Sequence, residues 1–320
     1  MVSWTASGDT PGGGWARDEP SRHRAARSRA LPRVALVSCR ELPLGDEDGP
    51  VLQAACAAAG QDTEWLVWDD PAVDWTSYDL VVIRTTWDYS PRRDDFVAWA
   101  ESVPRLANPA AVVRWNTDKT YLRDLAAAGV PVVPTTWLSP GGEVDLPDGC
   151  EVVVKPTVSA GARDTARYGA GESHLARAHA LALLDDGRPV MVQPYLGAVD
   201  DAGETGLLFC GGSYSHAVRK APLLVGEDDP VDGLYREEQI SPRDPAAAEL
   251  ALAERVLAAV PGGAGGLLYA RVDLLPGADG EPLLLELELT EPSFFFGTAP
   301  GSAERFADAV AAATATTRPA

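Results

Sequence analysis

Short apolar runs alternate with helix-like stretches through the first third of the chain. The apolar runs fall at residues 33–39, 63–68 and 79–84. Between the first two lies an amphipathic stretch, residues 51–59, which ends at Gly60. Short buried strands separated by helices are typical of a parallel sheet with helices on its faces. The pattern therefore predicts a small N-terminal α/β domain over residues 31–113.

The next stretch, WNTDKTYLRDLAAAG, has the period of one helix over residues 115–129. Asn116 or Thr117 suits its N-terminal cap, and Gly129 suits its left-handed terminator. Lys119 then lies in the first turn, where a cation is unfavourable unless an anion lies between it and the helix N-terminus. The pattern leaves open whether this lysine binds an anion or is simply solvated.

A loop of small residues follows the predicted strand EVVVKP, which carries Lys155 near its end. The loop, residues 157–171, is rich in Gly, Ala and Ser and has neither helical nor strand periodicity. Small residues let backbone N–H groups approach an anion, and such loops commonly cover phosphates. The alternatives are a lysine that reaches solvent from a strand end and an ordinary surface loop.

The remaining apolar runs predict an antiparallel sheet. The segments VMVQPYL, TGLLFC, GSYSHAVRK and YREEQI show two-residue alternation with turns between them. Alternation places Arg219 on one face of its strand and Lys220 on the other. The rest of the chain is thus expected to form a central subdomain with the phosphate-covering loop, residues 114–196, and a C-terminal subdomain, residues 197–320.

Three carboxylates are predicted to gather on one face of a hairpin near the C-terminus. The turn PGADGEP joins YARVDLL to LLLELEL, so Asp273 falls nearly opposite Glu286, and Glu286 shares a face with Glu288. Like charges so placed destabilise a sheet unless a cation intervenes. Oxygen ligands without Cys or His favour Mg²⁺ or Mn²⁺, which complete their shells with water and phosphate oxygens. The alternative is a solvated outer face of an edge hairpin.

Composition narrows the class of protein. The 320 residues include 27 Lys and Arg against 47 Asp and Glu, a net charge of −20, which argues against nucleic acid as the main partner. The four cysteines have no zinc-ligand or disulfide-framework spacing, and no apolar run approaches the ~20 residues that span a bilayer. A cytoplasmic protein without a membrane partner is expected. Residues 1–30 lack periodicity and are predicted to be a disordered tail.

The order of these motifs resembles that of the ATP-grasp superfamily, in its glutathione-synthetase-like branch. The matching motifs are Lys119, the VVVKP lysine with its loop, QPYL, Arg219, the RVD strand and the ELELTEP strand. The likeness covers residues 33–315. Within the superfamily, RTTWDYSPRRDDFVAW and ELELTEPSFFF resemble the ligases that close O-ureido-D-serine to D-cycloserine. The resemblance implies an ATP-grasp fold preceded by the parallel-sheet α/β domain, with ATP bound between two antiparallel subdomains.

The resemblance also implies roles for individual residues. The residues implied to bind ATP are Lys119, Lys155, Ser159 and Gly161 at the phosphates, Gln193, Tyr195 and Leu196 at adenine, and Glu204 at the ribose. The implied catalytic residues, beside the transferring phosphoryl group, are Arg219 and Arg271. The implied metal ligands are Asp273, Glu286 and Glu288, although this branch usually has Asn where the chain has Glu288. That difference leaves the number of bound ions open.

Substrate recognition is predicted at the end of a strand of the first domain, because open α/β sheets bind ligands at the carboxyl ends of their strands. The candidates there are Arg84 and the TTWDY turn that follows it, residues 85–89, with Thr85 and Asp88 as its polar members. The expected partner is a small amino-acid-like substrate, and a homodimer is expected because dimers are common among similar enzymes.

The resemblance implies an ADP-forming carbon–nitrogen ligase. A substrate carboxylate attacks the γ-phosphorus of ATP, and a nitrogen nucleophile then opens the acyl phosphate. If the nitrogen belongs to the same molecule, the product is a ring, as in D-cycloserine; an intermolecular ligase joining an amino acid to an amine is the first alternative. The second is an ATP-binding regulator without turnover, which only the Glu288 difference favours.

Overall fold

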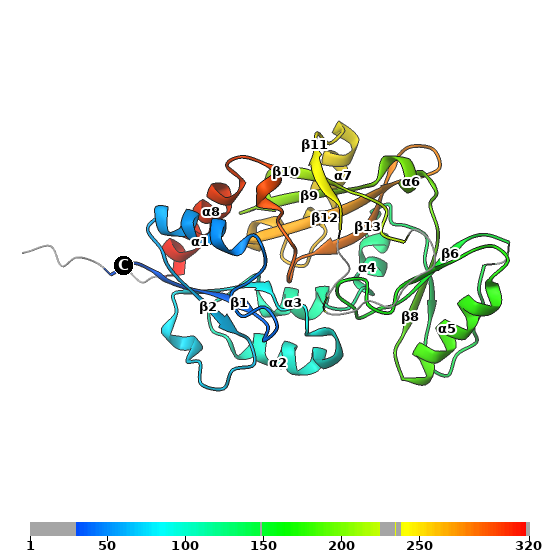
Figure 1. Cartoon of the computed structure of the whole chain (residues 1–320), viewed down its shortest axis with the longest axis horizontal. Helices are drawn as coiled ribbons and strands as arrows, with labels where there is room; N and C mark the ends of the chain where they lie inside the picture. Colours follow the sequence, from blue (N-terminus) through cyan, green and yellow to red (C-terminus); the bar gives the residue numbers. More distant parts are fainter. Residues whose placement is uncertain (1–29, 148, 225–233, 235–237, 318–320) are drawn as a thin grey trace, which may run out of the picture. The chain divides into compact units, whose positions relative to one another are not determined.

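The computed structural model describes residues 30–147, 149–224, 234 and 238–317. Apart from Ala30, the predicted tail lies outside the described residues, as does the first half of the predicted strand YREEQI, residues 235–237. The chain from Leu31 onward forms three sheets with helices on their faces (Figure 1). The first sheet is parallel, as predicted, and the other two are antiparallel. The prediction of one antiparallel sheet from VMVQPYL onward is wrong, because residues 190–194 pair with residues 152–156, while residues 204–220 belong to the other sheet.

The parallel sheet has the strand order β2-β1-β3-β4. Its elements are β1 (Arg33–Ser38), α1 (Gly49–Ala58), β2 (Asp62–Val67), η1 (Trp75–Ser77), β3 (Leu80–Thr85), η2 (Ser90–Arg92), α2 (Arg93–Ser102), β4 (Leu106–Ala107) and α3 (Ala110–Asn116). Alternate residues of β1 enter different apolar clusters: Leu36 packs with Leu52 of α1, and Val37 packs with Phe96 of α2. Both faces are therefore buried, which explains why β1 is an unbroken apolar run.

The second sheet has the strand order β5-β8-β6-β7. Its region comprises α4 (Tyr121–Ala127), β5 (Thr136–Leu138), β6 (Val152–Pro156), β7 (Ala166–Tyr168), α5 (Ser173–Asp185) and β8 (Val190–Pro194). Helix α5 covers one face, where Ala180 and Leu183 pack against Val154 and Val192 (Figure 1). On the opposite face, Val153, Lys155 and Gln193 line a cavity, and Met191 packs in a separate apolar cluster.

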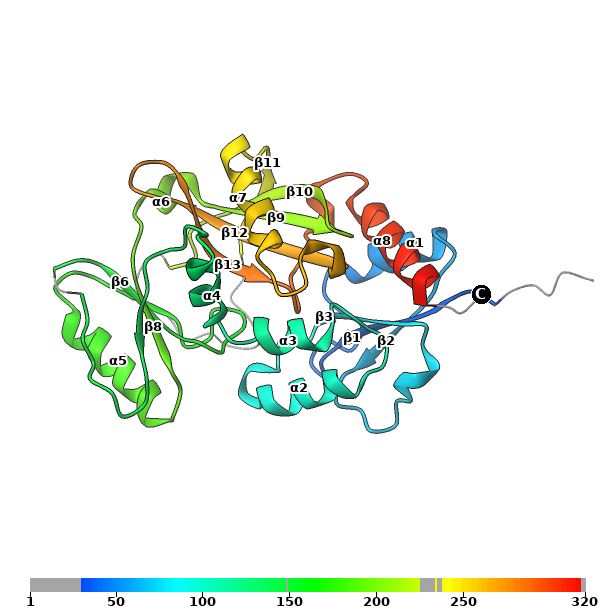
Figure 2. The ribbon, with the colours of Figure 1, turned by 180° about the vertical axis from the view of Figure 1, so that it is seen from behind.

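The third sheet has the strand order β11-β10-β9-β12-β13. Its region comprises α6 (Ala198–Ala202), β9 (Glu204–Cys210), β10 (Ser213–Lys220), β11 (Ile240–Arg243), α7 (Ala247–Ala258), η3 (Ala264–Gly266), β12 (Tyr269–Pro276), β13 (Pro282–Glu288), η4 (Phe296–Thr298) and α8 (Ser302–Thr317). Helices α4 and α7 pack on one face of this sheet, as Figure 2 shows from behind. The last helix, α8, packs against α1 in a cluster that includes Phe306 and Leu52. The C-terminal segment thus returns to the first sheet.

The predicted single helix over residues 115–129 is wrong. The chain forms two short helices instead, α3 ending at Asn116 and α4 beginning at Tyr121. The buried Asn116 amide donates to the carbonyl of Leu287 and accepts from the N–H of Leu289, both at 2.7 Å. These hydrogen bonds to β13 outweigh local helical periodicity, and Lys119 consequently lies in the turn between the helices.

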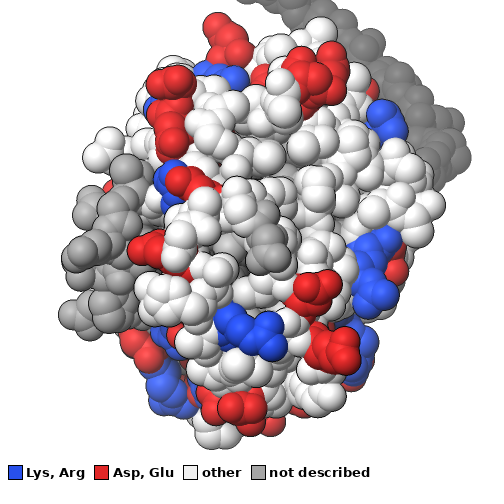
Figure 3. Space-filling model, turned by 90° about the vertical axis from the view of Figure 1, so that its right-hand side faces the viewer, with Lys and Arg blue, Asp and Glu red and all other residues white. Residues whose placement is uncertain are grey.

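Charged side chains are spread over the surface, and the four cysteines form no disulfide or zinc site among the described residues. On the face in Figure 3, acidic and basic side chains are interspersed with uncharged surface. Cys39, Cys56 and Cys210 are buried free thiols, and Cys150 is an exposed one. Among the described residues, every helix is too short or too polar to cross a membrane.

Candidate functional site

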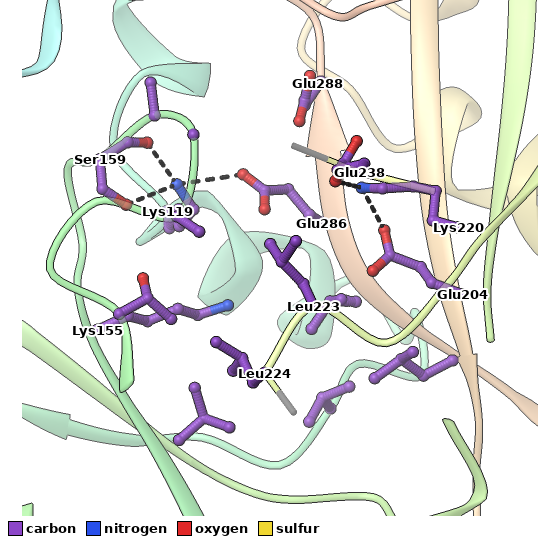
Figure 4. Close-up of a pocket in the computed structure, with 18 of the residues that line it drawn as sticks. Lys119, Lys155, Ser159, Glu204, Lys220, Leu223, Leu224, Glu238, Glu286 and Glu288 are labelled. Carbon is purple, nitrogen blue, oxygen red and sulfur yellow. Dashed lines mark hydrogen bonds and ion pairs between the residues drawn. The ribbon is translucent and has the colours of Figure 1, made fainter. Parts of the chain in front are cut away.

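A cavity of about 250 Å³ is lined by residues of the second and third sheets, of their loops, and of the turn that follows β3. Its charged lining residues are Lys119, Lys155, Glu204, Lys220, Glu238, Arg271, Glu286, Glu288 and Glu291. Apolar lining residues include Val133, Val153, Leu196, Leu275 and Leu285. Figure 4 shows lysines and glutamates from different elements directed into this space. A concave, partly apolar pocket with converging charges is the usual form of a ligand site.

Two lysines converge on the cavity from separate elements (Figure 4). The Lys119 Nζ donates to the Ser159 carbonyl at 2.8 Å and forms an ion pair with Glu286 at 3.1 Å. Lys155 forms no ion pair with a described residue, and burial lowers its pKa to about 8. A buried ammonium without a carboxylate partner is costly. The Lys155 ammonium group is therefore suited to binding an anion.

The loop after β6 has an unusual backbone beside these lysines. Gly161 has φ +61°, and the non-glycine residues Ala162 and Asp164 also lie in the left-handed region, at +58° and +54°. Ser159, Gly161 and Ala162 line the cavity. Strained non-glycine positions concentrate at ligand sites, and consecutive turns of this kind present N–H groups to anions.

The acidic side of the cavity is organised around two buried cations. Arg271 donates to Asp273 at 2.8 Å and to Glu288 at 2.5 Å. Lys220 forms ion pairs with Glu204 at 2.8 Å, Glu238 at 3.0 Å and Asp273 at 3.3 Å. Asp273, only 1% exposed, therefore bridges the two cations.

The pKa values of the Asp273 and Glu288 carboxyl groups shift in opposite directions. Burial would raise the pKa of Asp273, but Arg271 and Lys220 outweigh it and lower the pKa to about 2. Burial raises the pKa of Glu288 to about 8, although Arg271 is close, because the guanidinium is shared with Asp273 and other carboxylates lie nearby. Glu288 is thus short of positive charge, and an added cation would favour its ionised form.

The predicted metal site fits only in part. Among the described residues, no three Asp, Glu, His or Cys side chains are grouped closely enough to bind a metal ion. Asp273 pairs with Glu286 across β12 and β13, as predicted, but its carboxylate is engaged by Arg271 and Lys220. Glu286 and Glu288 face the cavity. Two carboxylates are a suitable donor set for Mg²⁺, which takes its other ligands from water and phosphate.

Comparison with known proteins assigns the family. Residues 34–108 match the family model for the N-terminal domain of D-cycloserine synthetase DcsG. The chain is 39% identical, over 288 residues, to the cycloserine biosynthesis protein DcsG of Streptomyces lavendulae, which covers 84% of this chain and 94% of that protein. The chain belongs to the DcsG family.

Solved structures agree with the DcsG assignment. The crystal structure of D-cycloserine synthetase DcsG has a TM-score of 0.79 and 38% identity, covering 88% of this chain and 99% of that one. The ATP-grasp ligase PsnB, solved with Mg and ADP, has a TM-score of 0.58 and 18% identity, covering 89% and 99%, and shares the fold alone. The predicted ATP-grasp fold and the resemblance to D-cycloserine-forming ligases are confirmed. The chain is an ADP-forming ligase that joins a carboxylate to an amine nitrogen.

In this DcsG-family ligase, all of the predicted ATP-binding residues line one cavity. They are Lys119, Lys155, Ser159, Gly161, Gln193, Tyr195, Leu196 and Glu204. Gln193 donates to Thr135 at 2.9 Å, and Arg167 lies 3.5 Å over the Tyr195 ring. Their individual roles stay predictions, but the structure brings them together from the turn between α3 and α4, from β6, β8 and β9, and from the loops that follow β6 and β8.

Arg219 and three of the substrate candidates lie outside this cavity. Arg219 donates to the carbonyl groups of Ala202 and Asp201, while Lys220 takes the cavity face of β10. Arg84 is buried against the rings of Phe294 and Phe306.

Thr85 and Asp88 are also engaged elsewhere. Thr85 shares a hydrogen bond with Ser38, and Asp88 accepts from Trp68 and Arg92. These contacts hold the strand end and the following turn in place. The described contacts of Arg84, Thr85 and Asp88 are therefore those of residues that stabilise the fold.

Several cavity residues were not predicted. They are Asn116, Lys220, Glu238, Glu291 and Ser293. Strand alternation opposite Arg219 is the signal that could have identified Lys220. Trp87 and Tyr89 belong to the TTWDY turn predicted for substrate recognition, and both line the cavity.

The segment after β13 is fixed by side chains from four other elements. The carbonyl of Glu291 accepts from the Trp87 indole at 3.0 Å, and that of Pro292 accepts from Arg84 at 3.0 Å. The carbonyl of Ser293 accepts from Arg271 at 3.3 Å, and that of Phe294 accepts from His216 at 2.8 Å. Four consecutive carbonyl groups are thus satisfied by donors distant in sequence, which fixes the backbone that carries Glu291 and Ser293.

Proposed function

We propose that this ligase activates the carboxylate of an O-ureido-serine as an acyl phosphate, and that a nitrogen of the same molecule closes the ring of a cycloserine. The 39% identity to DcsG, over almost its whole length, is the observation that carries the proposal. The names of these relatives, cycloserine biosynthesis protein and D-cycloserine synthetase, support a cycloserine product of the D-configuration. The O-ureido-serine substrate and the intramolecular attack rest on the likeness of the TTWDY and TEPSFFF segments.

In the proposed reaction, a substrate carboxylate oxygen forms a bond to the γ-phosphorus while the bond to the β-phosphate oxygen breaks and ADP leaves. Two anions must approach each other, so the positive groups of Lys119, Lys155 and Arg271 would lower the barrier by electrostatic stabilisation. The nitrogen bonded to the side-chain oxygen then attacks the acyl carbon and loses its proton, and inorganic phosphate leaves. The ring so formed still carries the carbamoyl group on that nitrogen, and one water releases this group as CO₂ and NH₃ to give the cycloserine. The loop at residues 157–164 would exclude water that could hydrolyse the acyl phosphate.

Mg²⁺ would be carried by Glu286 and Glu288 and would neutralise phosphate charge. Relatives with this fold have been solved with Mg and ADP, which supports this cofactor. The Asp273 carboxylate would hold the side chains of Arg271 and Lys220 in position through its ion pairs with both. A homodimer and a cytoplasmic location stay predictions.

Nucleotide affinity is expected to fall as the pH rises, because Lys155 then loses its positive charge. With a pKa of about 8, only about one tenth of this lysine is charged at pH 9, so the Kd for a non-hydrolysable ATP analogue should rise about tenfold between pH 7 and pH 9. Lys155→Arg keeps its charge over this range and should show a nearly constant Kd. Calorimetric titration at several pH values measures both; equal slopes for the two proteins would contradict this role of Lys155.

The function is tested by ADP release with O-ureido-D-serine, ATP and Mg²⁺, with the ring product identified by mass spectrometry. The expected result is ADP release with the single substrate, equal in amount to cycloserine formed. ADP release that requires two amino acids, or an amino acid and an amine, would instead identify an intermolecular ligase. Nucleotide binding with no turnover for any of these acids would indicate a regulator.

A further inference from the structure

Glu291 differs from the other carboxylates of the cavity in its charge balance. The cavity carboxylates with a Lys or Arg partner are Glu204, Glu238, Glu286 and Glu288. Glu291 is 9% exposed and also lines the cavity, yet no Lys or Arg among the described residues forms an ion pair with it. A buried carboxylate without a cation is costly, so this position is suited to a cation brought by a ligand.

The neighbours of Glu291 favour an organic cation over a metal ion. Tyr89 and Trp87 line the same cavity, and the Tyr89 hydroxyl forms a hydrogen bond with the Glu291 side chain. Aromatic rings with a carboxylate are the groups that proteins use to bind alkylammonium ions. A metal ion would require further oxygen ligands, and no third acidic or histidine side chain among the described residues joins such a group.

The backbone at Glu291 is fixed before any ligand arrives. Its carbonyl accepts from the Trp87 indole, and the next three carbonyl groups accept from Arg84, Arg271 and His216. Trp87 thus both lines the cavity and sets the position of the Glu291 backbone. A site fixed in this way loses little conformational entropy on binding.

We propose that Glu291, with Tyr89 and Trp87, binds the α-ammonium group of the amino-acid substrate. The inference rests on the proposed function and adds the residue that selects a zwitterionic acid. With its ammonium at Glu291, the substrate leaves its carboxylate to Lys119 and Arg271 of the same cavity. An ammonium ion has no lone pair, so an α-amino group kept protonated by Glu291 cannot attack the acyl phosphate of a second substrate molecule. Attack on its own acyl phosphate would require a three-membered ring, so the side-chain nitrogen is the one that closes the ring.

The test compares O-ureido-D-serine with its N-acetyl derivative, which has the same carboxylate but no ammonium group. The wild-type enzyme is expected to prefer the free amine by about 30-fold or more in kcat/KM, measured by ADP release. In Glu291→Gln this preference should fall to within a few-fold, through a raised KM for the free amine, while the Kd for an ATP analogue with Mg²⁺ stays unchanged. Glu254→Gln, the same substitution at an exposed position on α7, should keep the full preference.

Each outcome decides the inference. An unchanged preference in Glu291→Gln overturns it, and so does an equal loss of Mg²⁺-nucleotide affinity, because that would make Glu291 a metal ligand. If Glu291→Gln does not fold, Tyr89→Phe removes only the hydroxyl that orients Glu291, and its preference should fall several-fold; no change there overturns the inference. Absence of turnover by the wild-type enzyme with O-ureido-D-serine contradicts the proposed function itself, which separates the two failures.

Discussion

Glu286→Gln is expected to lower turnover by about 10²–10³-fold while the protein stays folded. Glu286 faces the cavity, pairs with Lys119 at 3.1 Å and stands opposite Asp273 in the hairpin register. Lys119 and Lys155 lower its pKa, so it is ionised at neutral pH and able to bind Mg²⁺. Glutamine has the same shape but lacks the charge, so binding of Mg²⁺ and alignment of the phosphates should fail together.

Initial rates of ADP release over a range of Mg²⁺ concentrations measure this effect. The half-saturating Mg²⁺ concentration should rise, and thermal unfolding should change little because Lys119 keeps its hydrogen bond to the Ser159 carbonyl. Glu281→Gln makes the same change at the exposed turn of the same hairpin and should leave both quantities unchanged. Full activity at ordinary Mg²⁺ in Glu286→Gln would remove Glu286 from the metal site.

Arg271→Met is expected to lower the free energy of unfolding by about 3–5 kcal/mol at pH 7. Its guanidinium reaches Asp273, Glu288 and the Ser293 carbonyl. Methionine retains much of the buried volume but leaves Asp273, which is 1% exposed, with Lys220 as its remaining basic partner. Removing one member of a buried ion pair leaves an uncompensated charge, which is the main source of the cost.

The loss in Arg271→Met should diminish at acid pH. Asp273 has a folded-state pKa near 2, below its ordinary value of 3.8, so it stabilises the wild-type protein above about pH 4 and loses that contribution as the pH falls toward 2. Urea unfolding at pH 7 and at about pH 2.5 measures the convergence of the two proteins. Arg243→Met breaks a more exposed pair with Glu249 and should cost less than about 1 kcal/mol. A similar cost for both variants would contradict the buried network.

Local patterns were sufficient for the strands and for much of the site. Two-residue alternation and the turn PGADGEP predicted the pairing of Asp273 with Glu286, because hairpin register depends on residues close in sequence. Motif order in the resemblance predicted a set of ATP-binding residues that the fold brings to one cavity. These successes concern features that a segment of about thirty residues, or a family pattern, can specify.

The failures come from contacts between distant segments. The break before Tyr121 depends on Asn116 bonding to β13, some 170 residues later, which helical periodicity cannot reveal. Arg84 looked available at a strand end, but Phe294 and Phe306 cover it from the far end of the chain. A buried arginine and an exposed one give the same local sequence signal.

The four carbonyl groups fixed by Trp87, Arg84, Arg271 and His216 have a consequence for enzyme engineering. Residues 291–294, which carry these carbonyl groups, form one wall of the cavity. Substitutions in this wall would disturb donors shared with the aromatic core and with the acidic network, so libraries directed there should yield mostly inactive variants. In the glycine- and alanine-rich covering loop, Lys119 and Arg188 hold Ser159 and Asp164, which lie on either side of Gly161 and Ala162. Attempts to widen the range of accepted acids should therefore begin with the loop and leave the wall intact.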